Sequence, residues 1–225
     1  MRTSRTLAVW IAVLPLAARG AGLDEAFAAM DKTAQQFKSV TADINRDVYT
    51  AVIDDHEKDV GVMKARREKS RDTRMLIEFT SPVQKFLAID GTEASVYTPK
   101  MKLNQVYDVK RGLVDQFLLL GFGASSAEVK AHYDVTFIAT EKVGAAATWH
   151  LQLVPKSPEV LKNLKKAELW IGQSGGLPVQ EKLFTSTTGD FELVNYSNVK
   201  LNPALSDKDV KLNLPKGVTT EHPKL

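Results

Sequence analysis

A glycine-rich segment carries the clearest nucleophile motif in the sequence. Gly172-Gln173-Ser174-Gly175-Gly176 matches the Gly-x-Ser-x-Gly nucleophile elbow, and Asp190 and His222 follow in hydrolase order. The elbow needs a strand, a sharp turn and then a helix. Here Leu177-Pro178-Val179 follow, and a proline beside a β-branched residue favours a strand. We therefore predict a hairpin turn and no enzyme, and keep a hydrolase that uses Ser174 as a rival hypothesis.

Metal chemistry finds little support in the residue spacing. The chain has no cysteine, and its four histidines are His56, His132, His150 and His222. None of them pairs with another histidine at ligand spacing. We predict no metal site and no cofactor. His150 follows Trp149 on an alternating strand, so we expect its side chain to face solvent.

A run of basic residues is the strongest local charge feature. Its members are Lys64, Arg66, Arg67, Lys69, Arg71 and Arg74. Such a run usually faces water at the end of a hairpin, and the alternative is a dock for an acidic partner or for lipid headgroups. The run lacks interleaved aromatic residues, so it does not resemble a single-strand nucleic-acid platform.

The first 22 residues have the composition of a secretory signal peptide. Arg2 and Arg5 precede an apolar segment, and small residues allow cleavage before Ala21 or before Leu23. A retained anchor is the alternative, although the apolar segment is short for a membrane span. The chain has 30 basic and 27 acidic residues, and removal of the signal leaves 27 of each. A neutral mature chain gives no global electrostatic case for binding nucleic acid.

The elements that must position any site are mainly strands. Residues Leu23 to Phe37 have the three-and-four spacing of an amphipathic helix. About ten short strands at even spacing follow, which predicts one domain over residues 23–225 built on a curled antiparallel sheet. The candidate strands are Val40–Ile53, Val60–Ala65, Arg74–Phe79, Phe86–Ile89, Ala94–Tyr97, Asn104–Val109, Tyr133–Glu141, Trp149–Leu153, Ala167–Ile171, Val179–Thr185, Asp190–Val199 and Val210–Leu214.

One apolar stretch interrupts the strands. Residues Leu113 to Phe122 are apolar nearly all round, and a helix of that kind must be covered on all sides. It is either a plug in a filled core or the lining of a space that another molecule fills. Ser125 or Ser126 then caps a short helix through His132.

The order of these pieces resembles the periplasmic outer-membrane lipoprotein carriers of the LolA-like family, over essentially the whole mature chain. The resemblance rests on the N-terminal helix, the apolar stretch near Phe117-Leu118-Leu119 and several short motifs. These are Ile77-Glu78-Phe79-Thr80-Ser81-Pro82, Ile89-Asp90-Gly91, Val96-Tyr97-Thr98-Pro99, Gln105-Val106, Leu153-Val154-Pro155-Lys156, Gly176-Leu177-Pro178 and Leu214-Pro215-Lys216-Gly217-Val218.

The resemblance implies a half-open antiparallel β-barrel of about ten strands with a helical lid. It implies a latch residue that holds the lid, for which Arg71 is the nearest match and Arg74 the alternative. The family's proline before this strand is missing here, and Ile77 replaces its tryptophan. The residues expected to contact acyl chains are Met75, Ile77, Phe79, Leu87, Ile89, Phe117 and Leu118, and strand alternation adds Phe137.

The expected function is therefore that of a monomeric periplasmic carrier that takes acyl chains of lipoproteins, or a related lipid, to the outer membrane. The partners implied by the resemblance are an inner-membrane lipoprotein-releasing transporter and an outer-membrane receptor. The alternative is a periplasmic regulatory or sensor domain of the same fold that binds lipoproteins or a protein partner without transport.

Overall fold

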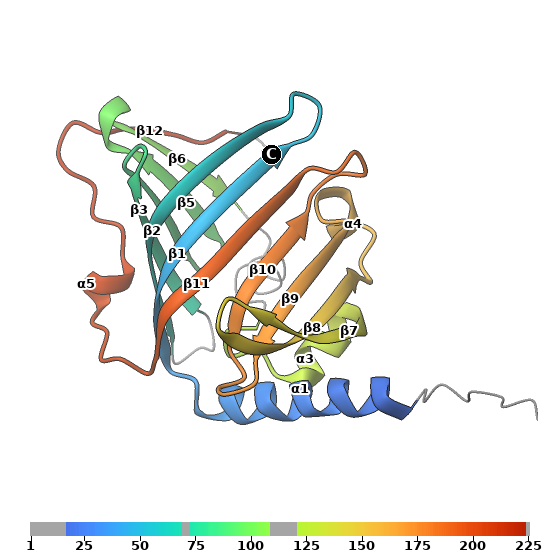
Figure 1. Cartoon of the computed structure of the whole chain (residues 1–225). Coiled ribbons are helices and arrows are strands. Elements are labelled where there is room, and N and C mark those ends of the chain that lie inside the picture. Colours follow the sequence, from blue (N-terminus) through green and yellow to red (C-terminus); the bar gives the residue numbers. More distant parts are fainter. Residues whose placement is uncertain (1–16, 69–72, 109–120, 224–225) are drawn as a thin grey trace, which may run out of the picture.

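A computed structural model of the chain describes residues 17–68, 73–108 and 121–223 (Figure 1). The predicted signal peptide falls mostly on residues 1–16, outside this part, and its cleavage stays a prediction. The elements are α1 (Ala17–Gln36), β1 (Ser39–Thr50), β2 (Asp55–Arg67), β3 (Thr73–Ser81), β4 (Lys85–Asp90), β5 (Glu93–Thr98), η1 (Pro99–Met101), β6 (Leu103–Asp108), α3 (Ser126–His132), β7 (Tyr133–Val143), β8 (Ala146–Pro155), α4 (Val160–Asn163), β9 (Lys166–Gly172), β10 (Pro178–Phe184), β11 (Phe191–Leu201), α5 (Asp207–Val210) and β12 (Thr219–Glu221).

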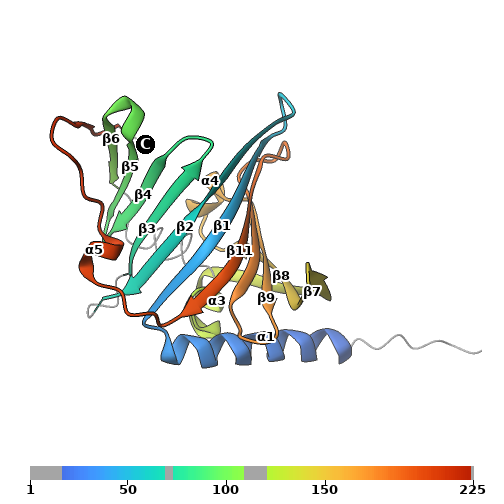
Figure 2. The same ribbon diagram turned by 60° about the vertical axis from the view of Figure 1, so that its left-hand side comes forward.

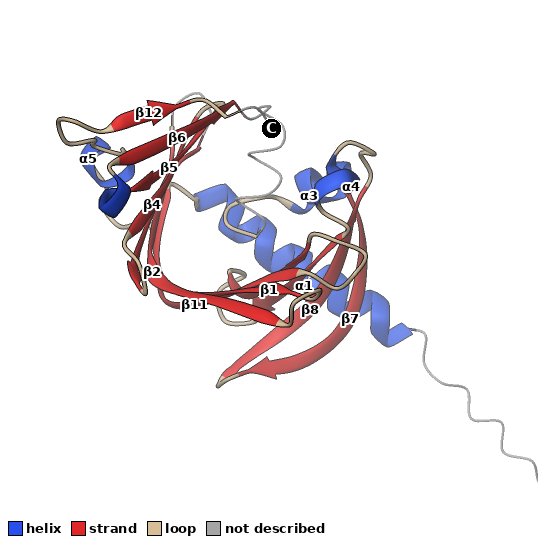
Figure 3. Cartoon of the chain, turned by 90° about the horizontal axis from the view of Figure 1, so that it is seen from above, coloured by secondary structure: helices blue, strands red, loops and turns tan. Residues whose placement is uncertain are grey.

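The strands form one curled sheet that does not close within the described residues. Its order is β12-β6-β5-β4-β3-β2-β1-β11-β10-β9-β8-β7. Strands β1 to β11 each overlap one of the candidate segments of the sequence, and β12 was not among them. Strands β1 and β11 pair in the middle and so join the two halves of the chain. Figure 3 shows the resulting wall from above, bent around one open side. The predicted half-open antiparallel architecture is confirmed.

Alternating side chains explain why the sheet has an inner and an outer face. On β1, Val40, Ala42 and Ile44 are buried, and on β8 Trp149, Leu151 and Leu153 are buried. A period of two places each set on one face of its strand. These inner faces supply most of the core.

The end of the chain differs from the prediction. Residues Val210 to Leu214 do not form a strand, because Val210 ends helix α5, where Ser206 and Asp209 form a capping box. Helix α5 packs outside the sheet against β2 and β3 (Figure 2). The last strand is β12, which pairs parallel to the edge strand β6. The hydrogen bonds of this capping box therefore favour a helix here, although the alternating apolar residues had predicted a strand.

Helix α1 lies across one end of the sheet (Figures 1 and 2). Its Ala26, Phe27 and Met30 are buried in a cluster with side chains of α3, α4 and β7–β9. The Thr33 hydroxyl donates to the carbonyl of Gly175 at 2.9 Å, and the Asp31 carboxylate accepts two hydrogen bonds from Ser126. The helix is therefore fixed at both the β9–β10 turn and the start of α3.

A second cluster of buried apolar side chains lies along the other half of the sheet. It contains residues of β1 to β4 together with Phe37, Phe122 and Val194. Among the described helices, none is both long and apolar enough to cross a membrane.

Candidate functional site

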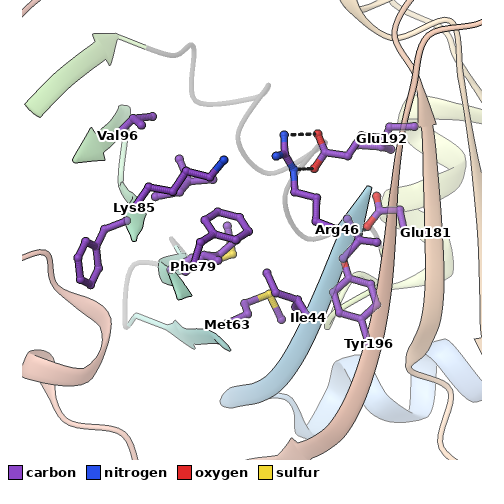
Figure 4. Close-up of a pocket in the computed structure, with 15 residues that line it drawn as sticks. Ile44, Arg46, Met63, Phe79, Lys85, Val96, Glu181, Glu192 and Tyr196 are labelled. Atoms are coloured by element: carbon purple, nitrogen blue, oxygen red, sulfur yellow. Dashed lines mark hydrogen bonds and ion pairs between the residues drawn. The ribbon is translucent and has the colours of Figure 1, made fainter. Parts of the chain in front are cut away.

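A cavity of about 310 Å³ opens beside the second cluster, between the two curled halves of the sheet (Figure 4). Its apolar wall consists of Ile44, Met63, Met75, Ile77, Phe79, Phe86, Leu87, Val96, Leu183 and Val194. Its polar members are Arg46, Lys85, Glu181, Glu192 and Tyr196. The volume is at the lower end of small-molecule pockets, and the mixture of an apolar wall with a few polar groups is typical of them.

Only some of the residues predicted to contact acyl chains lie in this cavity. Met75, Ile77, Phe79 and Leu87 all line this cavity. Ile89 is buried in the adjoining cluster and is not among the lining residues.

Phe137 lies apart from these residues, because it belongs to β7 and packs on the cluster under α1, beside Gly22. Strand alternation correctly places the Phe137 side chain on the inner face of the sheet, but it does not show which half of the sheet Phe137 belongs to. Phe117 and Leu118 lie outside the described residues, as does most of the predicted apolar helix.

A network of ion pairs borders the cavity. The Arg46 guanidinium donates to both Glu192 carboxylate oxygens at 2.8 and 3.2 Å, and to Asp59 at 2.7 Å. Lys85 lies 2.9 Å from Asp59, whose side chain is only 1% exposed, and 2.8 Å from Glu57. Burial would lower the pKa values of Arg46 and Lys85, but these carboxylates raise both overall. Both cations are therefore charged and already paired.

Phe79 connects this network to the apolar wall. Its ring centroid lies 5.8 Å from Arg46 Cζ and 5.1 Å from Lys85 Nζ. An aromatic face attracts a cation at such distances. The contact lets two charged side chains border an apolar space.

Glu181 is the most unusual group in the site. The residue is 5% exposed, and the Tyr196 hydroxyl donates to its Oε2 at 2.9 Å. Its Oε1 is buried without a hydrogen-bond partner. Burial raises the pKa of Glu181 to about 8, against the opposing effect of the Tyr196 hydrogen bond, and the nearby Glu192 adds to the rise. At neutral pH this carboxyl is mostly protonated.

Sequence reasoning missed the polar side chains of the cavity, although a signal was present. Arg46 lies between Ile44 and Val48 at a spacing of two, and Glu181 lies in the same way between Val179 and Leu183. A charged residue that shares a strand face with apolar neighbours points to the interior. That pattern identifies a buried charge, whereas its partner is known only once the strands are paired.

Ser174 lies in the turn of the β9–β10 hairpin, as predicted. The Gly176 backbone N–H donates to the Gly172 carbonyl at 2.9 Å, and a strand rather than a helix follows. The elbow's third part is therefore missing. The glycines have another role, because a Cβ on Gly176 would lie 2.4 Å from the Ala29 carbonyl oxygen of α1.

The histidines and acids do not form a metal centre within the described ranges, where no three such side chains come together. The expectation for His150 was wrong. It lies on the outer face of β8, but its side chain is only 13% exposed, because it stacks on Trp170 at 4.1 Å and meets Glu141 at 2.8 Å.

The described members of the basic run are bound within the protein itself. Lys64 pairs with Asp209, Arg66 with Glu68 and Asp207, and Arg74 with Asp90. Lys69 and Arg71 lie outside the described residues. The pairs with Asp209 and Asp207 tie α5 to β2, and the pair of Arg74 with Asp90 joins β3 to β4. The run therefore has a structural use within the chain.

Arg71, the predicted latch, lies in the part of the chain that is not described, and Arg74 is on the outer face of β3. Arg67, at the end of β2, contacts helix α1 and the residues that follow it. It donates to the carbonyls of Gly123 at 2.7 Å and Ala34 at 3.5 Å, and its guanidinium lies 5.0 Å from the Phe37 ring centroid. It joins the end of β2 to helix α1 and to the turn before α3.

Comparison with known proteins finds similarity in structure alone. No protein-family model and no curated protein matches the sequence. An uncharacterized conserved protein from Thermus thermophilus aligns with a TM-score of 0.54 and 12% identity, covering 91% of this chain and 98% of that one. MucB aligns with a TM-score of 0.51 and 12% identity, covering 88% of this chain and 63% of MucB.

A LolA superfamily protein from Nitrosomonas europaea gives a weaker alignment, with a TM-score of 0.43 and 14% identity, over 84% of this chain and 97% of that one. At these identities the comparisons concern the fold and not the function. The resemblance stated from the sequence predicted a half-open antiparallel β-barrel with a helical lid. The chain has such an open, curled antiparallel sheet, and it shares this fold with the Thermus protein and with MucB.

Proposed function

We propose that this protein is a periplasmic carrier that holds an acyl chain, from a lipoprotein or a related lipid, in the cavity between the two halves of its sheet. The observation that carries the proposal is the cavity of about 310 Å³, whose wall is mainly apolar. Met75, Ile77, Phe79 and Leu87 would contact the chain. An inner-membrane releasing transporter would supply the cargo and an outer-membrane receptor would accept it.

The size of the cavity sets the affinity that such a carrier can reach. A methylene group takes up about as much room as a water molecule, roughly 30 Å³, so the cavity holds about ten of them. At about 0.8 kcal/mol for each buried methylene, the gross gain is about 8 kcal/mol. That corresponds to a Kd near 1 μM at best, before the costs of association. One acyl chain could therefore be held and still be released without an energy source.

Uptake of a fluorescent acyl probe, followed by its transfer between donor and acceptor vesicles, tests this proposal. Val96 lines the cavity, whereas Val83 is 46% exposed on the β3–β4 loop. We expect Val96→Trp to weaken uptake at least tenfold, because the indole occupies the space of the chain. Val83→Trp is the matched control and should bind as the wild type does.

Equal uptake by the two tryptophan variants would contradict a site in this cavity. A protein that forms a stable complex with a periplasmic partner, and moves no lipid between vesicles, would instead support the regulatory or sensor role. Native mass spectrometry of protein taken directly from the periplasm would identify any lipid bound in the cell.

A further inference from the structure

The unpartnered oxygen of Glu181 raises the question of what meets it. Glu181 is 5% exposed, its Oε2 accepts the Tyr196 hydroxyl, and its Oε1 has no partner. A buried polar atom without a hydrogen bond costs roughly 1–3 kcal/mol. The carboxyl belongs to the lining of the cavity, where a ligand could complete its hydrogen bonding.

The protonation of this carboxyl decides which ligand atoms suit it. Burial raises the pKa of Glu181 to about 8, so the group is mostly neutral at pH 7. Because Oε2 already accepts a hydrogen bond, the proton belongs on Oε1. Glu181 can therefore donate to a carbonyl or hydroxyl oxygen of a ligand. It does not need a cation beside it.

The charges around the cavity disfavour an anion. Among the described residues, two cations line the cavity, Arg46 and Lys85. Arg46 pairs with Asp59 and Glu192, and Lys85 pairs with Asp59 and Glu57. The network therefore has an excess of one negative charge when Glu181 is neutral. An anionic headgroup could gain Arg46 only by displacing Asp59 or Glu192, and it could gain Lys85 by displacing Asp59 or the exposed Glu57. Displacing the 1% exposed Asp59 takes a partner from a buried carboxylate, which is costly, and any displacement adds a further negative charge to the network.

The opposite wall offers a place for a hydrocarbon chain. Met75, Ile77 and Leu87 come from β3 and β4, whereas Glu181 and Tyr196 come from β10 and β11. Figure 4 shows Glu181, Tyr196 and Arg46 together on one side, with Phe79, Lys85 and Val96 across from them. A ligand in this space would meet hydrocarbon on one side and a hydrogen-bond donor on the other.

We propose that Glu181 is a specificity-determining residue. It favours acyl ligands that place an uncharged ester or hydroxyl group in the cavity, and it disfavours acyl ligands that end in a carboxylate or phosphate. This inference rests on the proposed acyl binding and adds a substrate class to it. The chain lies on the apolar wall, and its first uncharged oxygen accepts the hydrogen bond of Glu181.

Two probes with the same chain test the proposal: 1-monolauroylglycerol and laurate, measured at pH 7 by displacement of a fluorescent acyl probe. We expect the wild type to bind the glyceride at least tenfold more tightly. Glu181→Leu should lose this preference by weakening glyceride binding about tenfold while laurate binding changes little. Glu181→Gln keeps an acceptor for Tyr196 and a donor for the ligand, and should restore most of the preference.

A control variant and the remaining outcomes separate this inference from the proposed function. Glu168→Leu removes a carboxylate on the outer face of β9 and should leave both affinities unchanged. If wild-type protein binds both probes equally, or Glu181→Leu keeps the preference, the selectivity inference is wrong and acyl binding stands. If neither probe displaces the dye because the protein takes up no acyl chain, the proposed function is wrong as well.

Discussion

The buried carboxyl of Glu181 should give this protein a pH-dependent stability that a single substitution removes. Its pKa in the folded protein is about 8, compared with a usual value of 4.5. The folded state therefore binds the proton more tightly than the unfolded state between these values. The resulting stabilisation is fully present below pH 4.5 and is lost as the pH rises through 8.

The magnitude follows from the shift. Each pKa unit corresponds to about 1.36 kcal/mol, so the group loses on the order of 3 kcal/mol of stabilisation between pH 5 and pH 8. The groups that face Glu181 are Tyr196 and Glu192 from β11 and Tyr133 from β7. Burial raises the pKa of both tyrosines, so neither titrates in this window.

Urea unfolding at a series of pH values measures this directly. The difference in unfolding free energy between the wild type and Glu181→Gln should fall by about 3 kcal/mol from pH 5 to pH 8. Glu168→Gln, a change on the outer face, serves as the control and should follow the wild-type curve in shape. Parallel curves for the wild type and Glu181→Gln would refute the argument that this carboxyl is neutral in the folded state.

Three further substitutions, one of them a matched control, test a close backbone contact and a buried ion pair. Gly176→Ala places a Cβ 2.4 Å from the Ala29 carbonyl oxygen at a residue with φ of 62°, and should lower the unfolding free energy by about 2 kcal/mol. Gly175→Ala is the control, because its Cβ meets no atom within 4 Å. It should lower the unfolding free energy by less than about 0.5 kcal/mol in the same urea titration. Arg46→Met removes a partner of the buried Asp59 and should lower the unfolding free energy by about 3 kcal/mol. A thermal melt that matches the wild type would show that the stability of the fold does not depend on this ion pair.

Much of the fold could be predicted because its signals are local. Alternating apolar residues located most strands to within a few positions, and Ser125 with Glu128 forms the capping box of α3. Strand β2 began earlier than predicted, at Asp55 instead of Val60, because its polar first residues pair with the end of β1. Cross-strand hydrogen bonds extend a hairpin whether or not its side chains are apolar.

The candidate site was less predictable because it depends on contacts between distant parts of the chain. Arg46 and Glu192 are 146 residues apart, and only the pairing of β1 with β11 brings them together. The contacts of Arg67 with the carbonyls of Gly123 and Ala34 also join distant segments, and counting from a family motif does not find them. Side-chain type alone identified the apolar wall but not the charges that border it.

The two apolar clusters of this sheet differ in a way that should affect the mechanical behaviour of the molecule. Helix α1 fills the space above β7, β8 and β9, whereas the half built on β1 to β5 borders the 310 Å³ cavity. Hydrostatic pressure favours states in which internal voids are eliminated. Under pressure, the half of the sheet that borders the cavity should therefore lose its packing first, while the half covered by α1 keeps its packing. A ligand in the cavity should reduce this difference between the two halves.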